Sequence, residues 1–131
     1  MKRFIIVICM LLSVFVFNCQ TTTNKKVTRL TPEEFQSSLN NNSVQLIDVR
    51  KPSEYVTGYI PNAVNIDFLS DDFTSNIDKL NKQKPVYIYC RSGKRSGKSA
   101  IEFEKAGFTK IYDLEGGILN WMSKGLPTES K

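Results

Sequence analysis

Tyr89-Cys90-Arg91-Ser92-Gly93-Lys94-Arg95-Ser96 is the stretch on which the fold prediction depends. The apolar run before it, residues 86–89, is β-branched and aromatic and predicts a buried strand. The segment after it, residues 99–106, predicts a helix that Gly107 closes. Cys90 is therefore expected where a strand ends, followed by a short loop and a helix N-terminus.

The residues after Cys90 favour a negatively charged sulfur. A helix N-terminus presents unpaired N–H groups and a partial positive charge. Cationic surroundings also favour the thiolate, which is the nucleophilic form of cysteine, and the nearby cations are Arg91, Lys94, Arg95 and Lys98. A small buried core residue is the alternative interpretation of Cys90. We predict Cys90 as the nucleophile, and the substrate-binding residues as Arg91, Ser92, Gly93, Lys94, Arg95 and Ser96.

The rest of the chain alternates between predicted strands and predicted helices. Apolar runs predict further strands at residues 27–30, 44–49, 64–66 and 110–114. Helices are predicted at residues 32–39, capped by Thr31, and at residues 52–55, 73–80 and 117–124. This order indicates an α/β fold with a mainly parallel sheet. Ligands of such sheets bind beyond the carboxyl ends of the strands, which is where Cys90 falls.

Composition limits the possible chemistry. The 131 residues are 40% hydrophobic and 24% charged, which suits one compact domain. The chain contains no histidine, which excludes histidine-dependent triads, Cys-His pairs and most catalytic zinc sites. The net charge of +5 comes without a long basic run or an aromatic ladder, so no nucleic-acid partner is expected. We expect no metal and no cofactor.

The N-terminus has the three parts of a secretory signal. Lys2 and Arg3 precede an apolar run, residues 4–17, which is short for a membrane span. The run ends at Asn18-Cys19, which resembles a bacterial lipoprotein processing site with Cys19 as the lipidated residue. Phe17 and Asn18 depart from the small residues that are usual there, and an uncleaved anchor or ordinary cleavage nearby are the alternatives. We predict an exported protein of the periplasm or cell envelope, attached to the membrane by a lipid on Cys19.

These features divide the chain into four parts. We predict a lipoprotein-type signal peptide over residues 1–18, a flexible tether over 19–26, a domain over 27–127 and a C-terminal tail over 128–131. Cys9 lies inside the apolar run, and a lipid on Cys19 would occupy its sulfur. Cys90 would then be the free thiol of the mature protein.

Four stretches give the chain its resemblance to a single-domain rhodanese, a member of the thiosulfate sulfurtransferase-like family. They are residues 46–55 (Leu-Ile-Asp-Val-Arg with Glu-Tyr), residues 58–66 (Gly-Tyr-Ile-Pro-Asn-Ala-Val-Asn-Ile), residues 86–96 around Cys90, and residues 106–121 (Ala-Gly-Phe through Leu-Glu-Gly-Gly to Trp). The resemblance implies a parallel five-stranded sheet with helices on both faces, and Cys90 as the residue that carries sulfur. Tyr59 departs from the histidine that this family most often has before Ile-Pro, and we expect a change in packing there.

The resemblance also implies a reaction. Cys90 would take sulfane sulfur from a small anionic donor such as thiosulfate, become a persulfide, and pass the sulfur to cyanide or a thiol. Asp48 and Arg50 are supporting residues that we expect to hold neighbouring loops in place, with acid–base catalysis as the less favoured role. We expect a monomer.

Two other functions remain open. One is a cysteine phosphatase or arsenate reductase of the same fold, in which an arginine six residues after the cysteine grips a tetrahedral oxyanion. Ser96 occupies that position here, and Arg95 comes one residue too early. The other is a membrane-tethered sulfur carrier or interaction module with little turnover.

Overall fold

A five-stranded sheet in the order β1-β5-β4-β2-β3 forms the centre of the computed structural model, which describes residues 25–40 and 44–131. Every pair of neighbouring strands is parallel. The strands are β1 (Val27–Leu30), β2 (Gln45–Asp48), β3 (Val64–Asn65), β4 (Val86–Tyr89) and β5 (Ile111–Leu114). The helices are α1 (Pro32–Leu39), α2 (Pro52–Tyr55), α3 (Phe73–Ile77), α4 (Lys94–Lys105) and α5 (Gly117–Ser123).

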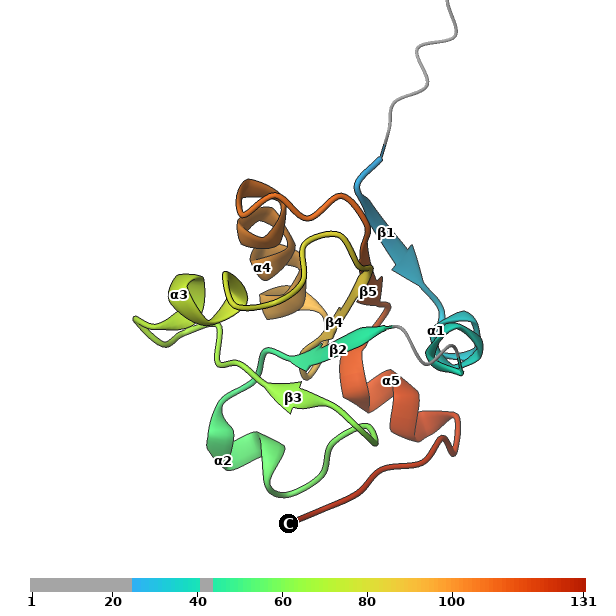
Figure 1. Cartoon of the computed structure of the whole chain (residues 1–131). Coiled ribbons are helices and arrows are strands. Elements are labelled where there is room, and N and C mark those ends of the chain that lie inside the picture. The colour runs from blue at the N-terminus through green and yellow to red at the C-terminus, as the bar shows by residue number, and fades with distance from the viewer. Residues whose placement is uncertain (1–24, 41–43) are drawn as a thin grey trace, which may run out of the picture.

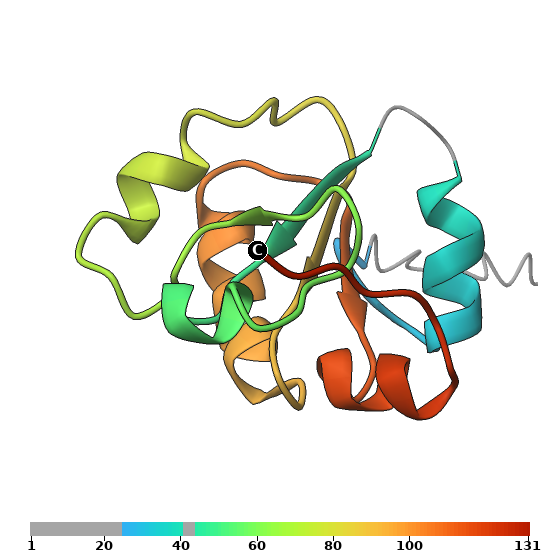
Figure 2. The same cartoon turned by 90° about the horizontal axis from the view of Figure 1, so that it is seen from below.

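Helices cover both faces of the sheet, as predicted. Figure 1 shows α3 and α4 on one side and α1 and α5 on the other, and Figure 2 shows the same division from below. Successive side chains of a strand point to opposite faces. In β4, Val86 and Ile88 therefore join the core under α3 and α4, whereas Tyr87 and Tyr89 join the core under α1 and α5. The predicted α/β fold with a five-stranded parallel sheet is confirmed.

Two helix ends follow directly from local sequence. Thr31 caps α1 through a reciprocal pair of hydrogen bonds with Glu34, with Pro32 in the first turn. At the end of α4, Gly107 has a φ of 105°, which is a conformation that glycine adopts without strain. The predicted closure of this helix by Gly107 is confirmed.

Two predicted helix boundaries are wrong. Helix α4 begins at Lys94 and not at residue 99, because Gly93, with a φ of 102°, turns the chain directly from the loop into the helix. Gly97 then lies inside the first turns without interrupting them. Helix α3 ends at Ile77, and the hydrogen bond from the Leu80 N–H to the Ile77 carbonyl is part of a turn that follows it.

The two ends of the described chain are tied to the domain. The Ile111 N–H donates to the Lys26 carbonyl (2.8 Å), so the ladder of β1 and β5 reaches into the predicted tether. Glu129, in the predicted tail, exchanges two backbone hydrogen bonds of 2.8 Å with Tyr59. The Lys131 N–H donates to the Val56 carbonyl (3.1 Å), and its ammonium lies 5.2 Å from the centre of the Tyr55 ring. Residues 128–131 are therefore part of the fold and not a free extension.

The predicted signal peptide and the predicted lipidation site, Cys19, lie outside the described residues and stay predictions. Within residues 25–40 and 44–131, none of the helices has the length and apolar character needed to cross a membrane.

The C-terminal contacts predict the effect of a truncation. Deleting residues 129–131 removes both Tyr59–Glu129 hydrogen bonds and the bond from Lys131 to Val56. We expect the free energy of unfolding to fall by about 1–3 kcal/mol, measured by urea denaturation. The double variant Glu129→Ala/Lys131→Ala keeps these backbone bonds and should lose less than the truncation. Equal losses would contradict a stabilising role of the backbone bridge.

Candidate active site

Cys90 follows the last residue of β4, which lies between β5 and β2 at the centre of the sheet. The residue is 1% exposed, and its side chain packs in the core cluster under α4. The Gly93 N–H donates to the Cys90 Sγ over 3.0 Å. This is the conformation expected of a loop that curls around the sulfur, with one backbone amide already directed at it.

The connection between β4 and α4 is short. Only Arg91, Ser92 and Gly93 lie between Cys90 and the first residue of the helix. Lys94, Arg95 and Ser96, which were predicted as loop residues, form the first turn of α4. The sulfur therefore lies beside the N-terminus of a twelve-residue helix, where the partial charge is positive.

The loop is held from its other side by α5. The N–H groups of Ile118 and Leu119 donate to the carbonyls of Cys90 (2.9 Å) and Arg91 (3.1 Å). Gly117 lies between these segments with a φ of 63°, and a Cβ atom at this position would come within 2.6 Å of the Cys90 carbonyl oxygen. We did not predict Gly117 as a site residue, although the Gly-Gly pair before a helix was a visible signal.

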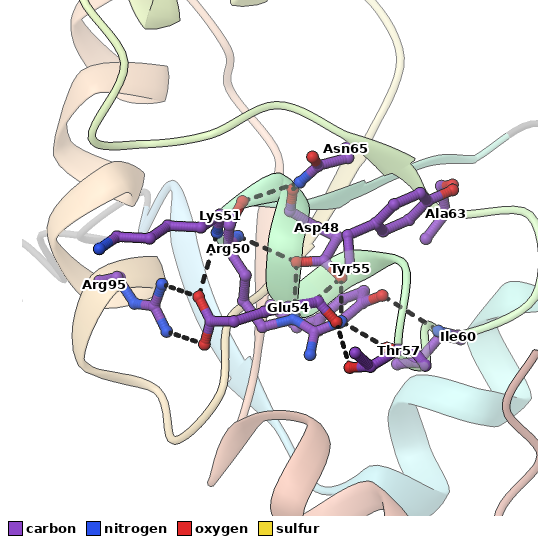
Figure 3. Close-up of polar contacts among 12 residues, drawn as sticks. Asp48, Arg50, Lys51, Glu54, Tyr55, Thr57, Ile60, Ala63, Asn65 and Arg95 are labelled. Atoms are coloured by element: carbon purple, nitrogen blue, oxygen red, sulfur yellow. Dashed lines mark hydrogen bonds and ion pairs between the residues drawn. The ribbon is translucent and has the colours of Figure 1, made fainter. Parts of the chain in front are cut away.

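Arg95 pairs with a residue that we did not predict in the site. Its guanidinium donates to both carboxylate oxygens of Glu54, at 2.7 and 2.9 Å, as Figure 3 shows. The hydrogen bonds from Arg95 lower the pKa of Glu54 to about 2, with further help from the Lys51 backbone N–H. Because Glu54 neutralises it, Arg95 offers an anionic substrate less charge than its sequence position suggests.

The other predicted binding residues differ in exposure. Arg91, Ser92 and Lys94 are exposed, and neither Arg91 nor Lys94 forms an ion pair within the described part of the chain. Ser96 is fully buried, and its hydroxyl donates to the Gly93 carbonyl over 3.3 Å. Arg91 and Lys94 are thus the cations placed to meet a donor from solution, whereas Ser96 shapes the loop. Their roles in substrate binding stay predictions.

Asp48 and Arg50 form a buried ion pair at the end of β2. Arg50 donates to both carboxylate oxygens of Asp48, with a shortest distance of 2.6 Å, and also to the Gly58 carbonyl at 2.6 Å. Burial disfavours the charged guanidinium, but the hydrogen bonds and charge of Asp48 raise the pKa of Arg50 overall. The Asn65 amide donates to the backbone carbonyls of Asp48 and Arg50 (Figure 3). This geometry connects β2, β3 and the loop after α2, and so supports the predicted role in holding loops.

Tyr89, the residue before Cys90, contributes to the same network. Its hydroxyl accepts a hydrogen bond from the Ile60 N–H at 3.0 Å, and its ring centre lies 5.8 Å from the Arg50 guanidinium. Burial is the main reason that the pKa of Tyr89 is raised, with the negative charge of Asp48 second. The hydroxyl therefore stays neutral and acts as a structural group.

The described residues contain no cluster of three or more histidine, cysteine, aspartate or glutamate side chains arranged to hold a metal ion. The expectations that the chain needs neither metal nor cofactor, and that it is a monomer, stay predictions.

The rhodanese-like domain model matches residues 31–124. The chain belongs to the rhodanese-like family. Among its relatives, the uncharacterized protein YqhL of Bacillus subtilis is 40% identical over 95 residues, which cover 72% of each protein. A sulfurtransferase of Allochromatium vinosum is 34% identical over 84 residues, covering 64% of this chain and 77% of that protein.

The chain also resembles part of a longer relative and a solved structure. The tRNA uridine(34) hydroxylase of Pelagibacter ubique is 35% identical over 108 residues, which are 82% of this chain but 36% of that protein. The chain thus spans about a third of the hydroxylase. The crystal structure of a rhodanese-like domain protein from Staphylococcus aureus is 34% identical, with a TM-score of 0.65 over 79% of this chain and 98% of that one.

The contact of Gly117 with the loop predicts a local sensitivity to substitution. Gly117→Ala places a Cβ against the Cys90 carbonyl and also imposes a positive φ on alanine. We expect a loss of about 2–4 kcal/mol in the free energy of unfolding, or a displaced Cys90 loop with reduced sulfur transfer.

Gly125→Ala is the matched control, because Gly125 has a φ of 69° but no atom within 4 Å of the place that a Cβ would take. It should lose only the backbone term, about 1–2 kcal/mol, and keep its activity. Equal effects of the two variants would show that the close approach at Gly117 is unimportant.

The Glu54–Arg95 pair predicts a pH dependence of stability. The pKa of Glu54 is lowered from 4.5 to about 2 in the folded protein. Its contribution is therefore complete above about pH 4.5 and is lost as the pH falls toward 2. We expect Glu54→Gln to reduce the free energy of unfolding at pH 6 and to make little difference near pH 2, measured by urea denaturation at both values. Glu104→Gln, which changes an exposed carboxylate outside any described ion pair, is the control. An unchanged stability of Glu54→Gln at pH 6 would contradict the assignment.

Proposed function

We propose that this rhodanese-like domain is a sulfurtransferase that moves sulfane sulfur from a small anionic donor, such as thiosulfate, to cyanide or a thiol through a persulfide on Cys90. The observation that carries the proposal is the position of the Cys90 sulfur. It lies at the end of the central strand, 3.0 Å from the Gly93 amide and beside the N-terminus of α4. The sulfurtransferase among the relatives adds support.

In the first step, the Cys90 thiolate attacks the outer sulfur of thiosulfate. A new bond forms between the Cys90 Sγ and that sulfur, the S–S bond of thiosulfate breaks, and sulfite leaves with the electron pair. The cysteine then carries a persulfide anion. The helix N-terminus stabilises negative charge at this place, and Arg91 and Lys94 attract the anionic donor.

In the second step, cyanide attacks the outer sulfur of the persulfide. The bond between the two sulfur atoms breaks, thiocyanate leaves, and the Cys90 thiolate is restored. A thiol acceptor would take the sulfur in the same way. Among the described residues Cys90 is the single cysteine, so no second described thiol is available to resolve the persulfide.

The loop also argues against phosphate or arsenate chemistry. A cysteine phosphatase needs an arginine that grips a tetrahedral oxyanion beside the nucleophile. The sixth residue after Cys90 is the buried Ser96. Arg95, one position earlier, donates to both carboxylate oxygens of Glu54. A compact sulfur is the better occupant of so short a loop. The hydroxylase relative is almost three times as long as the stretch that matches this chain, so its name describes a larger protein.

The proposal predicts the behaviour of a single substitution. Cys90→Ser should reduce thiosulfate-to-cyanide transfer to the uncatalysed level, because serine cannot form a persulfide. The measurement is thiocyanate production together with intact mass, in which the wild-type protein exposed to thiosulfate should gain about 32 Da on Cys90. Cys19→Ser is the control and should keep both signals.

Three results distinguish the alternatives. Sulfur on Cys90 without catalytic turnover would assign a sulfur carrier instead of an enzyme. A phosphate or arsenate adduct on Cys90 without any sulfur adduct would assign the phosphatase or reductase class. Persistent sulfur transfer by Cys90→Ser would overturn the proposal.

A further inference from the structure

Four lysines gather at the edge of the sheet where the strands begin, opposite the edge that carries Cys90. Lys25 and Lys26 precede β1, Lys84 lies two residues before β4, and Lys110 precedes β5. The register places Val27, Val86 and Ile111 side by side on the three strands, so Lys26, Pro85 and Lys110, which precede them, also lie side by side. Lys25 and Lys84 each come one residue earlier in the chain. We call these four lysines the basic edge.

The described backbone confirms this proximity. The Ile111 N–H donates to the Lys26 carbonyl at 2.8 Å, and the Val86 N–H donates to the Lys110 carbonyl at 3.0 Å. Neighbouring strands lie about 4.8 Å apart. The lysines that precede three adjacent strands thus lie close together at one end of the sheet.

The positive charge of the basic edge is not neutralised within the described residues. All four side chains are exposed, and none of them takes part in an ion pair there. Other lysines of the domain do find partners, since Lys82 pairs with Asp78 and Lys105 pairs with Glu102. The basic edge is therefore a surface suited to an external anion.

A shallow hollow lies within this surface. It has a volume of about 260 Å³ and is lined by Lys25, Lys26, Thr28, Thr109, Lys110 and Tyr112. Three ammonium groups together with hydroxyl groups that can donate hydrogen bonds are the chemistry that recognises a phosphate. Several phosphates on one surface would engage the hollow and Lys84 together.

The neighbouring sequence favours a lipid surface over a nucleic acid. The apolar run of residues 4–17 ends eight residues before Lys25, and the predicted lipidation site Cys19 lies six residues before it. Eight extended residues span at most about 29 Å. A bilayer that holds either a lipid on Cys19 or the uncleaved run is thus within reach of the basic edge. Single-stranded nucleic acid stacks its bases on several aromatic side chains, but Tyr112 is the one aromatic residue that lines the hollow, and one face of its ring is stacked on Tyr87 at a centroid distance of 4.7 Å.

We propose that the basic edge binds the phosphate headgroups of an anionic lipid bilayer and so sets the orientation of the domain. Cys90 lies at the opposite edge of the sheet. The strands β4 and β5 separate it from the basic edge, and each of these four-residue strands is about 13 Å long. The bound domain presents its sulfur site to the surrounding solution and not to the lipid. This inference is independent of the reaction at Cys90.

Lysine footprinting on vesicles tests the orientation with the full chain. The protein is reconstituted in phosphatidylcholine vesicles with or without phosphatidylglycerol, treated with acetic anhydride, and analysed by peptide mass spectrometry. On vesicles with the anionic lipid we expect acetylation of Lys25, Lys26, Lys84 and Lys110 to slow by at least about fivefold. High salt should abolish this protection, because it screens exposed charges. Lys51 and Lys98, which are exposed near the Cys90 edge, should react equally in both vesicles.

Charge-reversal variants make the test specific. Lys84→Glu/Lys110→Glu should remove the protection of Lys25 and Lys26, whereas Lys51→Glu/Lys98→Glu, which changes the net charge equally, should keep it. Circular dichroism checks that both variants are folded. Equal acetylation on the two kinds of vesicle overturns the proposal. Protection by added RNA but not by the anionic vesicles also overturns it, in favour of a nucleic-acid surface.

Discussion

The loop that carries Cys90 depends on a close approach between two backbone segments far apart in the chain. The first N–H groups of α5 would lack partners within their own helix, and the carbonyls of Cys90 and Arg91 accept two of them. Each segment thus supplies the hydrogen bonds that the other needs. The approach leaves no space for a Cβ atom at Gly117, so a residue without a side chain is a condition for the geometry. Further along the same loop, the Gly93 amide faces the sulfur.

The charged groups around this loop have different tasks. Asp48 and Arg50 are buried and paired, so they add rigidity at the end of β2 without adding net charge. Glu54 neutralises the charge of Arg95 through an ion pair, which also connects α2 to the first turn of α4. What remains for a substrate is the helix N-terminus together with the exposed Arg91 and Lys94. The basic edge lies where the strands begin, and its proposed partner is an anionic bilayer. One parallel sheet thus separates a site for a small anion from a surface for the headgroups of a bilayer.

Much of the fold and part of the site could be predicted from local sequence. The apolar runs identified the strands because a parallel strand covered on both faces has to be apolar along its length. The position of Cys90 at the end of β4 followed from the change between that run and the polar residues after it. The start of α4 was predicted five residues too late, because residues 94–98 are polar and carry no apolar periodicity. Of Gly93 and Gly97, only Gly93 has a positive φ and turns the chain. The pairing of Arg95 with Glu54 was missed because the two residues are 41 positions apart.

By itself, the sequence determined the class of fold, the order of the elements, the position of Cys90 at the end of a buried strand and the absence of a histidine base. These properties depend on residue type and local pattern, which are present in the chain before it folds. Only the tertiary structure decided which cations near Cys90 remain free, which glycine the loop requires and which lysines share one edge of the sheet. Such properties arise from contacts between distant segments, whose geometry no local pattern contains. The stretch from Tyr89 to Ser96 therefore located the candidate site around Cys90, while α2 and α5, packed around it, determined its charge and shape.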